Sequence, residues 1–437
     1  MQQKMTTRRG FLAGTATAAA AFSIIPRHCL GGPSHIAPSD KITHAIIGCG
    51  GIHGSHTGHI KRLSETGSQL ISLCDVDTTH LAARKKGKKG VTGYGDFREM
   101  LAKEDIDVCH IATPPHWHAL MAIAAAEAGC DVWCEKPMTR TIGESEAVRR
   151  TIQEHGRMLR INTWFRFQSN LYGMKCLVKP LKKLVMAGAL GDGPITVRLS
   201  HHTGFNFKSN WQGKTDLPTQ PIPKALNWDL WQGPAPAMPY NTHRCHKTFR
   251  GYWQYDSGGL GDMCQHYIDP VQYILGKDHT SPVRIKSHGH FPQHPEAVRP
   301  WGGVTMEYAD GSKIIMESAD SPCPLTRGKP FLEGSKGKIY PGFRCEPTNL
   351  RALADTLPDP EPMVTNFHES VRTRKPFALN EENGHRSNLL VHLADIAIRI
   401  PRELKFNPET LLFEGDEEAN RLVHQPMRAP WRLPQFN

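Results

Sequence analysis

The chain has 437 residues, of which 39% are hydrophobic and 22% charged, as is typical of a folded, soluble protein. This length exceeds what one hydrophobic core usually organises, so we expect two domains. The formal net charge is +11, but the first 40 residues hold four basic side chains against one acid. The remainder keeps 49 basic and 41 acidic residues, an excess that favours acidic partners and says nothing about the fold.

The first 35 residues have the features of an export signal. Arg8 and Arg9 precede Phe11 and Leu12, and a modest apolar stretch rich in Ala and Thr follows over 13–25. This pattern resembles a twin-arginine signal, although a fortuitous arginine pair is the alternative. The stretch is too short to span a bilayer with normal flanks. We therefore expect export by the twin-arginine pathway to the periplasm or another extracytoplasmic space, without a membrane span.

From residue 41 to 163, short apolar runs alternate with helical periods. Strands are predicted at 44–47, 69–74, 107–112, 131–134 and 158–162, and helices at 117–128 and 143–155. Such alternation predicts an α/β Rossmann domain, with a parallel sheet and right-handed crossovers. The basic run at 84–89 has no interleaved aromatic residues, so we interpret it as a solvated helix face. Its alternatives are a nucleic-acid patch or a 2′-phosphate clamp, and we expect no nucleic-acid partner.

Residues 164–437 have a different pattern and are predicted to form an α+β domain with a largely antiparallel, open sheet. A helix is expected at 169–187 and a strand at 195–200. The Pro-, Trp- and His-rich residues 201–255 are predicted to be a long functional loop. Asp310 and Gly311 favour a tight hairpin turn between strands at 303–308 and 312–318, and a second turn is expected at 333–338. The C-terminal segment is expected to pack back on the core.

The cysteines and histidines give no sign of a metal or disulfide framework. Five of the eleven cysteines fall in or beside predicted core strands, where cysteine behaves as a small buried hydrophobe: Cys49, Cys74, Cys109, Cys130 and Cys134. No Cys-x-x-Cys spacing occurs, which argues against a zinc knuckle or a dithiol site. Among the 24 histidines, the adjacent His201 and His202 are the candidates for metal ligands, but no spacing to further ligands supports a metal site. We expect no metal.

A glycine-rich turn follows the first predicted strand. Residues 48–53 read Gly-Cys-Gly-Gly-Ile-His and open a helix, which is the context in which this pattern binds a dinucleotide. Gly48 permits the tight turn, and Gly50 lets the backbone approach a pyrophosphate beside the free N–H groups of the helix start. Gly51 and Ile52 complete the predicted cradle. The third position, usually Gly or Ala, is His53.

Asp75 ends the second predicted strand. A carboxylate there accepts hydrogen bonds from the adenosine ribose hydroxyls and repels a 2′-phosphate, so NAD is favoured over NADP. The alternative for the turn and Asp75 together is an ordinary strand-to-helix connection with a surface acid. Residues 113–118, Thr-Pro-Pro-His-Trp-His, end the fourth strand at the same sheet edge and predict cofactor contacts by Thr113, Pro114, His116 and His118.

Residues 134–137, Cys-Glu-Lys-Pro, close the next strand and place Lys136 at the same edge. A lysine beside a nicotinamide ring can hydrogen-bond a reacting hydroxyl and stabilise the alkoxide-like charge that develops as hydride leaves. Residues 258–269 open a glycine-rich helix on which Asp262 and His266, four apart, share a face. A histidine of near-neutral pKa is suited to take the hydroxyl proton, and Asp262 could orient it or bind a substrate hydroxyl. Taken alone, each of these residues is as easily a surface side chain.

The glycine turn, Asp75, residues 134–137 and the Asp262/His266 helix together resemble the Gfo/Idh/MocA oxidoreductase family. Residues 228–250 resemble an exported, twin-arginine subgroup abundant in planctomycete-like bacteria. The resemblance implies action on sugars or cyclic polyols, a homodimer or homotetramer, Lys136, Asp262 and His266 as catalytic residues, and Glu135 and Lys136 near the cofactor. Aromatic faces suit sugar rings, which makes the following residues candidate substrate contacts: Trp164, Arg166, His202, Trp228, Trp231, His243, Arg244 and Tyr252.

We therefore expect an NAD-dependent oxidoreductase acting on a hydroxyl of a sugar, glycoside or cyclic polyol. Export favours a tightly bound cofactor that is reduced and reoxidised without leaving. The alternative is an NAD-dependent glycosidase that works through a transient keto-sugar and elimination. A second alternative is a non-catalytic protein that binds NAD or sugar with the same fold.

Overall fold

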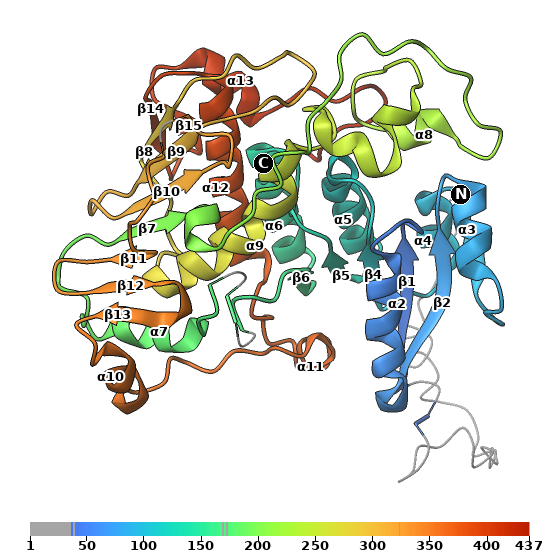
Figure 1. Ribbon diagram of the computed structural model, residues 1–437. Coiled ribbons are helices and arrows are strands. Elements are labelled where there is room, and N and C mark those ends of the chain that lie inside the picture. Colours follow the sequence, from blue (N-terminus) through green and yellow to red (C-terminus); the bar gives the residue numbers. More distant parts are fainter. Residues whose placement is uncertain (1–35, 38–39, 168–169, 172–173, 323, 437) are drawn as a thin grey trace.

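The computed structural model describes residues 36–437 apart from 38–39, 168–169, 172–173, 323 and 437 (Figure 1). The predicted signal segment, residues 1–35, lies outside this described part. Within it, no helix combines the length and apolar character needed to cross a membrane. Two sheets organise the chain, one formed within residues 42–161 and the other within residues 196–413.

The first sheet confirms the predicted Rossmann architecture. Its strands are all parallel and follow the order β3-β2-β1-β4-β5-β6. Their bounds are Ile42–Ile47 (β1), Ser68–Cys74 (β2), Thr92–Tyr94 (β3), Val108–Ile111 (β4), Asp131–Cys134 (β5) and Leu159–Ile161 (β6). The order reverses between β1 and β4, and the crevice outside the carboxyl ends at such a point is where α/β sheets bind ligands.

The helices of this domain begin where short polar side chains cap their first turns. Asp77 accepts from the N–H groups of α3, Asp96 from α4 and Thr141 from α6. The helices are His53–Arg62 (α2), Thr78–Lys85 (α3), Phe97–Lys103 (α4), His118–Glu127 (α5) and Ile142–Glu154 (α6). The helices predicted at 117–128 and 143–155 are therefore confirmed as α5 and α6, and the five cysteines assigned to the core are buried.

The second sheet has nine strands and is antiparallel except where β10 pairs with β7, as predicted for an α+β domain. Its order is β13-β12-β11-β7-β10-β9-β8-β14-β15. The bounds are Thr196–Leu199 (β7), Arg284–His288 (β8), Gly303–Glu307 (β9), Lys313–Glu317 (β10), Leu332–Glu333 (β11), Lys338–Tyr340 (β12), Arg344–Glu346 (β13), Leu404–Asn407 (β14) and Leu412–Phe413 (β15). The β9–β10 and β11–β12 hairpins confirm both predicted turns.

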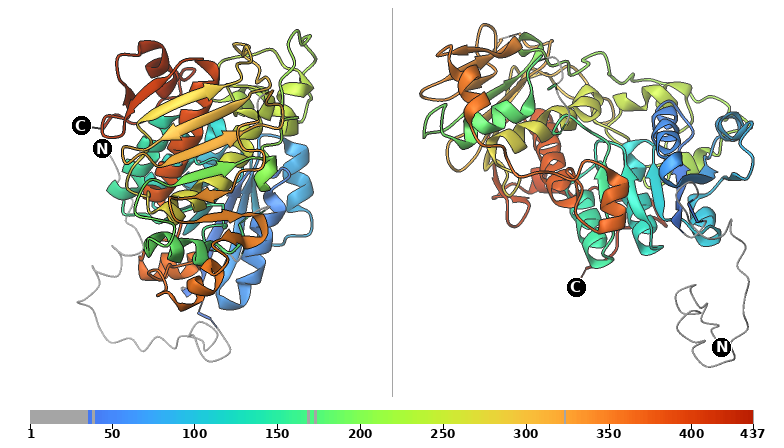
Figure 2. Two further views of the ribbon diagram at one scale, coloured as in Figure 1. Left: turned by 60° about the vertical axis from the view of Figure 1, so that its left-hand side comes forward. Right: turned by 90° about the horizontal axis from the view of Figure 1, so that it is seen from below.

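Long helices cover one face of this sheet, and the other face is uncovered in the side view (Figure 2). Gly258–Leu275 (α9) and Glu381–Arg399 (α12) pack on each other, and α12 also contacts α6 of the first domain. Shorter helices complete the domain at Val178–Met186 (α7), Leu350–Thr356 (α10), Phe367–Thr373 (α11) and Glu417–Val423 (α13). Buried side chains of α7, α9 and α12 join those of the strands in one large core.

The helix predicted at 169–187 is too long, because the structure begins α7 at Val178. Pro180 explains the difference. It has no N–H to bond to the carbonyl of residue 176, and its ring would clash there, so a helix cannot run through it from upstream. The helix starts instead where Pro180 falls within its first turn, and Leu171 forms a short antiparallel bridge with Cys176 before it.

Residues 201–255 were predicted to be a loop, but they contain the helix Trp228–Gln232 (α8), several 3-10 turns and a small core of their own. That core includes Trp228, Trp231, Tyr240, Phe249 and Tyr252. The segment lies over the carboxyl edge of the parallel sheet, beyond the tips of β1 and β2 (Figure 1). Backbone hydrogen bonds from Asn227 to Val76 and from Thr78 to Ala225 hold it there. Most of its aromatic side chains therefore stabilise the segment itself.

We predict that Gly48→Ala destabilises the protein by on the order of 3 kcal/mol and abolishes nucleotide binding. Gly48 has φ +102°, and an added Cβ would lie 2.5 Å from the carbonyl oxygen of Ala112. Urea unfolding and NAD titration measure the two effects. Gly54→Ala in α2 is the matched control, since its Cβ would meet nothing within 4 Å. Equal stability of the two variants would contradict this account of the turn.

Candidate active site

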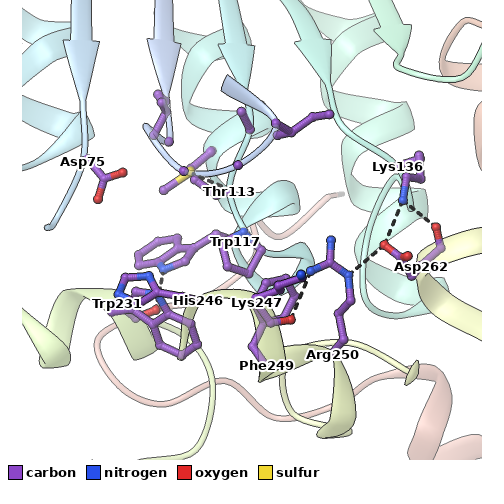
Figure 3. Close-up of a pocket in the computed structure, with 18 of the residues that line it drawn as sticks. Asp75, Thr113, Trp117, Lys136, Trp231, His246, Lys247, Phe249, Arg250 and Asp262 are labelled. Carbon is purple, nitrogen blue, oxygen red and sulfur yellow. Dashed lines mark hydrogen bonds and ion pairs between the residues drawn. The ribbon is translucent and has the colours of Figure 1, made fainter. Parts of the chain in front are cut away.

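A cavity of about 740 Å³ lies between the carboxyl edge of the parallel sheet, the start of α9 and the segment 201–255 (Figure 3). The turn after β1 and the ends of β2, β4 and β5 contribute its wall on one side. The following predicted residues line it: Gly48, Gly50, Gly51, Ile52, Asp75, Thr113, Pro114, Lys136, Trp164, Trp231, Asp262 and His266. The cavity therefore unites the predicted cofactor cradle with the predicted catalytic residues.

The glycine turn is held by side chains on both sides. Asp75 accepts a hydrogen bond from the Cys49 N–H at 2.6 Å. Arg84 donates to the carbonyl oxygens of Cys49 and Gly50 at 3.1 and 2.9 Å, so this member of the basic run is not simply a solvated charge. His53 is buried, and its Nδ1 lies 3.1 Å from the Gly48 carbonyl oxygen, which accommodates it at the third position of the pattern.

Asp75 lies at the far end of the cavity from Lys136 (Figure 3). Its Oδ1 accepts from the Asp77 N–H at 2.8 Å, so each carboxylate oxygen already has one backbone partner. Burial raises the pKa of Asp75, although these two backbone hydrogen bonds act in the opposite direction. The turn, the start of α2 and this carboxylate fit a dinucleotide, because they offer a close backbone approach and an acceptor for ribose hydroxyls.

Lys136 and Asp262 form an ion pair across the other end of the cavity (Figure 3). Lys136 Nζ lies 3.1 Å from Asp262 Oδ1 and donates to its backbone oxygen at 2.5 Å. Arg250 Nε donates to the same Oδ1 at 2.8 Å, and Lys208 Nζ lies 3.5 Å from Oδ2. Burial alone would raise the pKa of Asp262, but Lys136 and Arg250 together hold it well below its usual range. Asp262 is therefore a carboxylate shared by three cations.

His266 is oriented by Thr163 and not by Asp262, which corrects one expectation from the sequence. Its Nδ1 lies 2.7 Å from Thr163 Oγ1, while Asp262, one turn earlier on α9, faces the cations. The expected near-neutral pKa is also corrected. Burial, followed by the charge of Lys136, lowers the pKa of His266 to about 3, so the imidazole is neutral at physiological pH. Nε2 has no hydrogen-bond partner in the described part of the protein.

Three predicted cofactor contacts do not line the cavity. His116 is buried and bonds the Trp231 carbonyl oxygen at 2.9 Å, so it ties the loop after β4 to the segment 201–255. His118 bridges the carbonyl oxygens of Thr113 and Pro137. Glu135 lies behind the cavity wall, 3.0 Å from His56 Nε2. His116 and His118 fix the backbone of the wall, and Glu135 is bonded to side chains behind it, which corrects the assignment of all three as direct contacts.

Five predicted substrate contacts also lie elsewhere. Arg166 is buried in an ion pair with Asp269 at 2.6 Å and with Asp278. His202 lines a separate small cavity with Glu317. The other three, His243, Arg244 and Tyr252, make local contacts outside the main cavity. His243 Nδ1 lies 2.7 Å from Tyr252 Oη, and Arg244 donates to Glu296 at 2.9 Å. Trp228, also considered, packs against Trp231 and Tyr240 in the core of the segment. The composition of 201–255 therefore indicated the right segment but not which of its side chains line the cavity.

Several cavity residues were missed by the sequence reasoning. They are Lys208, Trp211, His246, Lys247, Phe249 and Arg250, whereas Trp117 belongs to the motif at 113–118 that was expected to line the site. Phe249 and Arg250 fall within the part of the chain used for the family resemblance, but no spacing related them to Asp262. His246 also approaches Asp77 and His80, with all three ligand atoms within 4.8 Å of one another. No sequence spacing could have shown this possible cation-binding group, because His246 lies far along the chain.

Comparison with known proteins identifies the family. Residues 42–163 match the NAD-binding Rossmann-fold model of the Gfo/Idh/MocA oxidoreductase family, and residues 174–433 match the model of its C-terminal alpha/beta domain. The chain belongs to this family. A levoglucosan dehydrogenase from Pseudarthrobacter phenanthrenivorans is 31% identical over 277 residues, which cover 62% of this chain and 57% of the relative. The family assignment confirms NAD binding as a property of the fold.

One further relative and one solved structure are also similar to this chain. A glycosyl hydrolase family 109 protein from Shewanella baltica is 28% identical over 231 residues, or 47% of each chain. The WlbA dehydrogenase from Bordetella pertussis, solved with NADH and UDP-GlcNAcA, aligns with a TM-score of 0.58 at 18% identity, covering 84% of this chain and 99% of that one. At this identity the structural likeness concerns the fold alone. The chain spans roughly half the length of the curated relatives it matches.

We predict that acid destabilises the protein through its buried neutral histidines. Burial lowers the pKa of His116 to about 3. In the unfolded chain the same imidazole has its ordinary pKa of 6.5 and takes up a proton near that pH. Its stabilising contribution is therefore complete above pH 6.5 and is lost as the pH falls from 6.5 toward 3. For this residue the loss at pH 5 amounts to about 2 kcal/mol.

Unfolding by urea at pH 7.5 and pH 5 measures this effect. The stability difference between the two pH values should be smaller by about 2 kcal/mol in His116→Gln, whose amide can still bond the Trp231 carbonyl oxygen. His279→Gln replaces an exposed histidine and should leave the difference unchanged. An identical pH difference in wild type and His116→Gln would rule out this source of acid sensitivity.

Proposed function

We propose that the protein is an NAD-dependent oxidoreductase that oxidises a hydroxyl of a sugar, glycoside or cyclic polyol. The observation that carries the proposal is the Lys136–Asp262 ion pair, with His266 beside it, in the same cavity as the glycine turn. The names of the relatives support the substrate class, because levoglucosan dehydrogenase and inositol 2-dehydrogenases are among them. We favour NAD over NADP because the Asp75 carboxylate would repel a 2′-phosphate.

Each residue has a role that follows from its position. Lys136 Nζ donates a hydrogen bond to the substrate oxygen and stabilises the negative charge that develops on it. Asp262 keeps the ammonium group in place. His266, neutral and fixed through Nδ1 by Thr163, accepts the hydroxyl proton at Nε2. NAD⁺, when bound, accepts the hydride that leaves the carbon bearing this hydroxyl.

We further propose that NAD stays bound through the catalytic cycle and that residues 1–35 direct export of the folded, loaded protein. The support is the Arg8–Arg9 pair with its weakly apolar continuation, together with the scarcity of free NAD outside the cytoplasm. In a closed cycle, the oxidation of one substrate is balanced by the reduction of another acceptor. The uncovered face of the nine-stranded sheet is a plausible contact between copies, so a dimer or tetramer stays a prediction.

The second candidate is a glycosidase that uses bound NAD transiently. The similarity to the glycosyl hydrolase family 109 protein favours it specifically. In this reaction, oxidation next to an acidic C–H permits elimination of the glycosidic bond, and the bound NADH then restores the alcohol. Release of free sugar without net redox change would mark this reaction, whereas reduction of an external acceptor marks the oxidoreductase.

We predict that denaturing the purified, folded protein releases about one equivalent of NAD or NADH. Mass spectrometry and absorbance at 340 nm identify and quantify the nucleotide. A sugar or polyol substrate added to the native protein should then raise the 340 nm absorbance without added cofactor. Recovery of NADP in place of NAD would overturn the cofactor choice, and an empty protein would overturn the closed cycle.

Lys136→Ala is the corresponding test of mechanism. Because Lys136 is not required to hold the glycine turn, the variant should fold and retain nucleotide but lose hydride transfer by at least about a thousandfold. Single-turnover absorbance measures the rate, and the nucleotide content of the variant serves as its internal control. Failure to fold, or an unchanged rate, would refute the catalytic role.

For export, we predict that replacing Arg8 and Arg9 together by lysine leaves the protein in the cytoplasm, since twin-arginine signals depend on the arginine pair. Cell fractionation followed by immunoblotting measures the distribution. Lys4→Gln alters a charge in the same segment without touching the pair and should still be exported. Export of the double variant at the wild-type level would contradict the assignment.

A further inference from the structure

The substrate end of the cavity carries an excess of positive charge. Lys136, Lys208 and Arg250 all line the cavity there and all approach one carboxylate, that of Asp262. In Figure 3, Lys136 and Arg250 reach Asp262 from opposite sides. One carboxylate compensates one cation, so two positive charges at this end face the space where a substrate would lie.

Two further carboxylates near this cluster do not remove the excess. Asp256 lies outside the cavity lining, and its Oδ1 accepts the Ser257 N–H at 2.8 Å. Burial raises the pKa of Asp256 to about 7, so much of it is protonated at neutral pH. Glu135 also lies outside the lining and is held by His56 at 3.0 Å and by Asn162 at 2.5 Å. Neither carboxylate points into the cavity.

Arg250 is prepared to bind a second anion. Its Nε donates to Asp262 and its Nη1 to the Lys247 backbone oxygen at 3.2 Å, while Nη2 has no acceptor within the described residues. The guanidinium carbon lies 4.8 Å from the Phe249 ring centroid and 5.2 Å from that of Trp211. This stacking fixes the plane of the guanidinium group, and a fixed guanidinium suits the two oxygens of a carboxylate or sulfate group.

Lys208 is held more loosely. Its side chain is 40% exposed, and its contact with Asp262 Oδ2 is long, at 3.5 Å. The ammonium group can therefore turn from Asp262 to an incoming anion at little cost. Trp164 and Trp211 also line this part of the cavity and offer flat apolar faces of the kind that stack on sugar rings.

The opposite end of the cavity does not share this excess of cations. Asp75 and Asp96 line it, together with aromatic and apolar side chains such as Phe97. Asp96 is paired with Arg98 at 2.5 Å, and Arg84 is bonded to the carbonyl oxygens of the glycine turn. The Asp75 carboxylate suits the hydroxyl groups of a ribose, whereas an end with excess cations suits an anion.

From these observations we propose that the substrate is an acidic sugar, with a carboxylate or sulfate ester held by Arg250 and Lys208 while its hydroxyl meets Lys136. The inference rests on the proposed function and narrows its substrate class. A uronic acid and a sulfated sugar share the chemistry that these cations recognise, and the experiment separates them. The reaction itself is unchanged: the hydroxyl proton passes to His266, and the hydride passes to bound NAD⁺.

The test compares matched sugars on the full-length, nucleotide-loaded protein. Glucose, galactose and mannose are each compared with the corresponding uronic acid and 6-sulfate, and kcat/KM is followed through the reduction of an external electron acceptor at the absorbance of that acceptor. We expect at least one acidic member to exceed its neutral partner by about tenfold or more. If a uronic acid has the highest kcat/KM, the anionic group that the site binds is a carboxylate. If a 6-sulfate has the highest kcat/KM, that group is a sulfate ester.

Two variants test the residues. Arg250→Met and Lys208→Met should each reduce the ratio of acidic to neutral kcat/KM by about tenfold, mostly through KM, because each removes one charge contact to the anion. Calorimetric binding of the preferred acid should weaken in parallel. Lys286→Met, on the exposed side of β8 in the second sheet, is the matched control and should keep the ratio.

The outcomes separate the two proposals. Oxidation of neutral sugars in preference to every acidic partner would overturn the acidic-substrate inference and leave the oxidoreductase function intact. A preference that survives both variants would overturn the role of these cations. Nicotinamide reduction by none of the sugars, with no calorimetric binding of any acid, would count against both. If Arg250→Met fails to fold, the half-exposed Lys208 still provides the test.

Discussion

The geometry of the cavity depends on the ion pair between Lys136 and Asp262, because this pair joins the two domains at the point where the reaction is proposed to occur. Lys136 follows β5 of the parallel sheet, and Asp262 lies in the first turns of α9. Their side chains are only 13% and 7% exposed, so each would be costly to bury alone. The cost of burying the pair is reduced because Asp262 also forms ion pairs with Arg250 and Lys208. Lys136 in turn donates a hydrogen bond to the Asp262 backbone oxygen. The cluster thus fixes how the edge of the sheet faces the helix.

The nucleotide end of the cavity depends on backbone shape more than on charge. Gly48 has a positive φ and lies against the Ala112 carbonyl, so a side chain there would push the first and fourth strand ends apart. Asp75 and Arg84 then hold the turn from its N–H and carbonyl sides. Asp75 therefore has a structural role at the glycine turn in addition to the ribose contact proposed for it. His116 and His118 have only a structural role, because they fix the wall through backbone carbonyl groups.

Local patterns in the sequence predicted many of the elements that depend on neighbours in the chain, although the helix expected at 169–187 overlooked the local effect of Pro180. Strand and helix periods located the parallel sheet, the hairpins and α9, and the carboxyl-edge rule placed Lys136 and the glycine turn together. The errors in the site came from contacts between distant segments. The spacing of Asp262 and His266 put them on one helix face, but α9 meets Thr163 on one side and Arg250 on the other, so the two residues have different partners. Lys208 and Arg250 lie in an aperiodic segment, whose path over the sheet is set by its own aromatic core.

An anionic substrate would change the environment of Asp262 as it binds. Arg250 and Lys208 are paired with the Asp262 carboxylate, and an incoming carboxylate or sulfate would compete for the same two cations. Asp262 would then rely more on Lys136, whose ammonium group lies 3.1 Å away. Stronger pairing with Lys136 would fix that ammonium group at the reacting oxygen only when an acidic substrate is present. The excess of cations would in this way link recognition of the anion to placement of the lysine that polarises the hydroxyl.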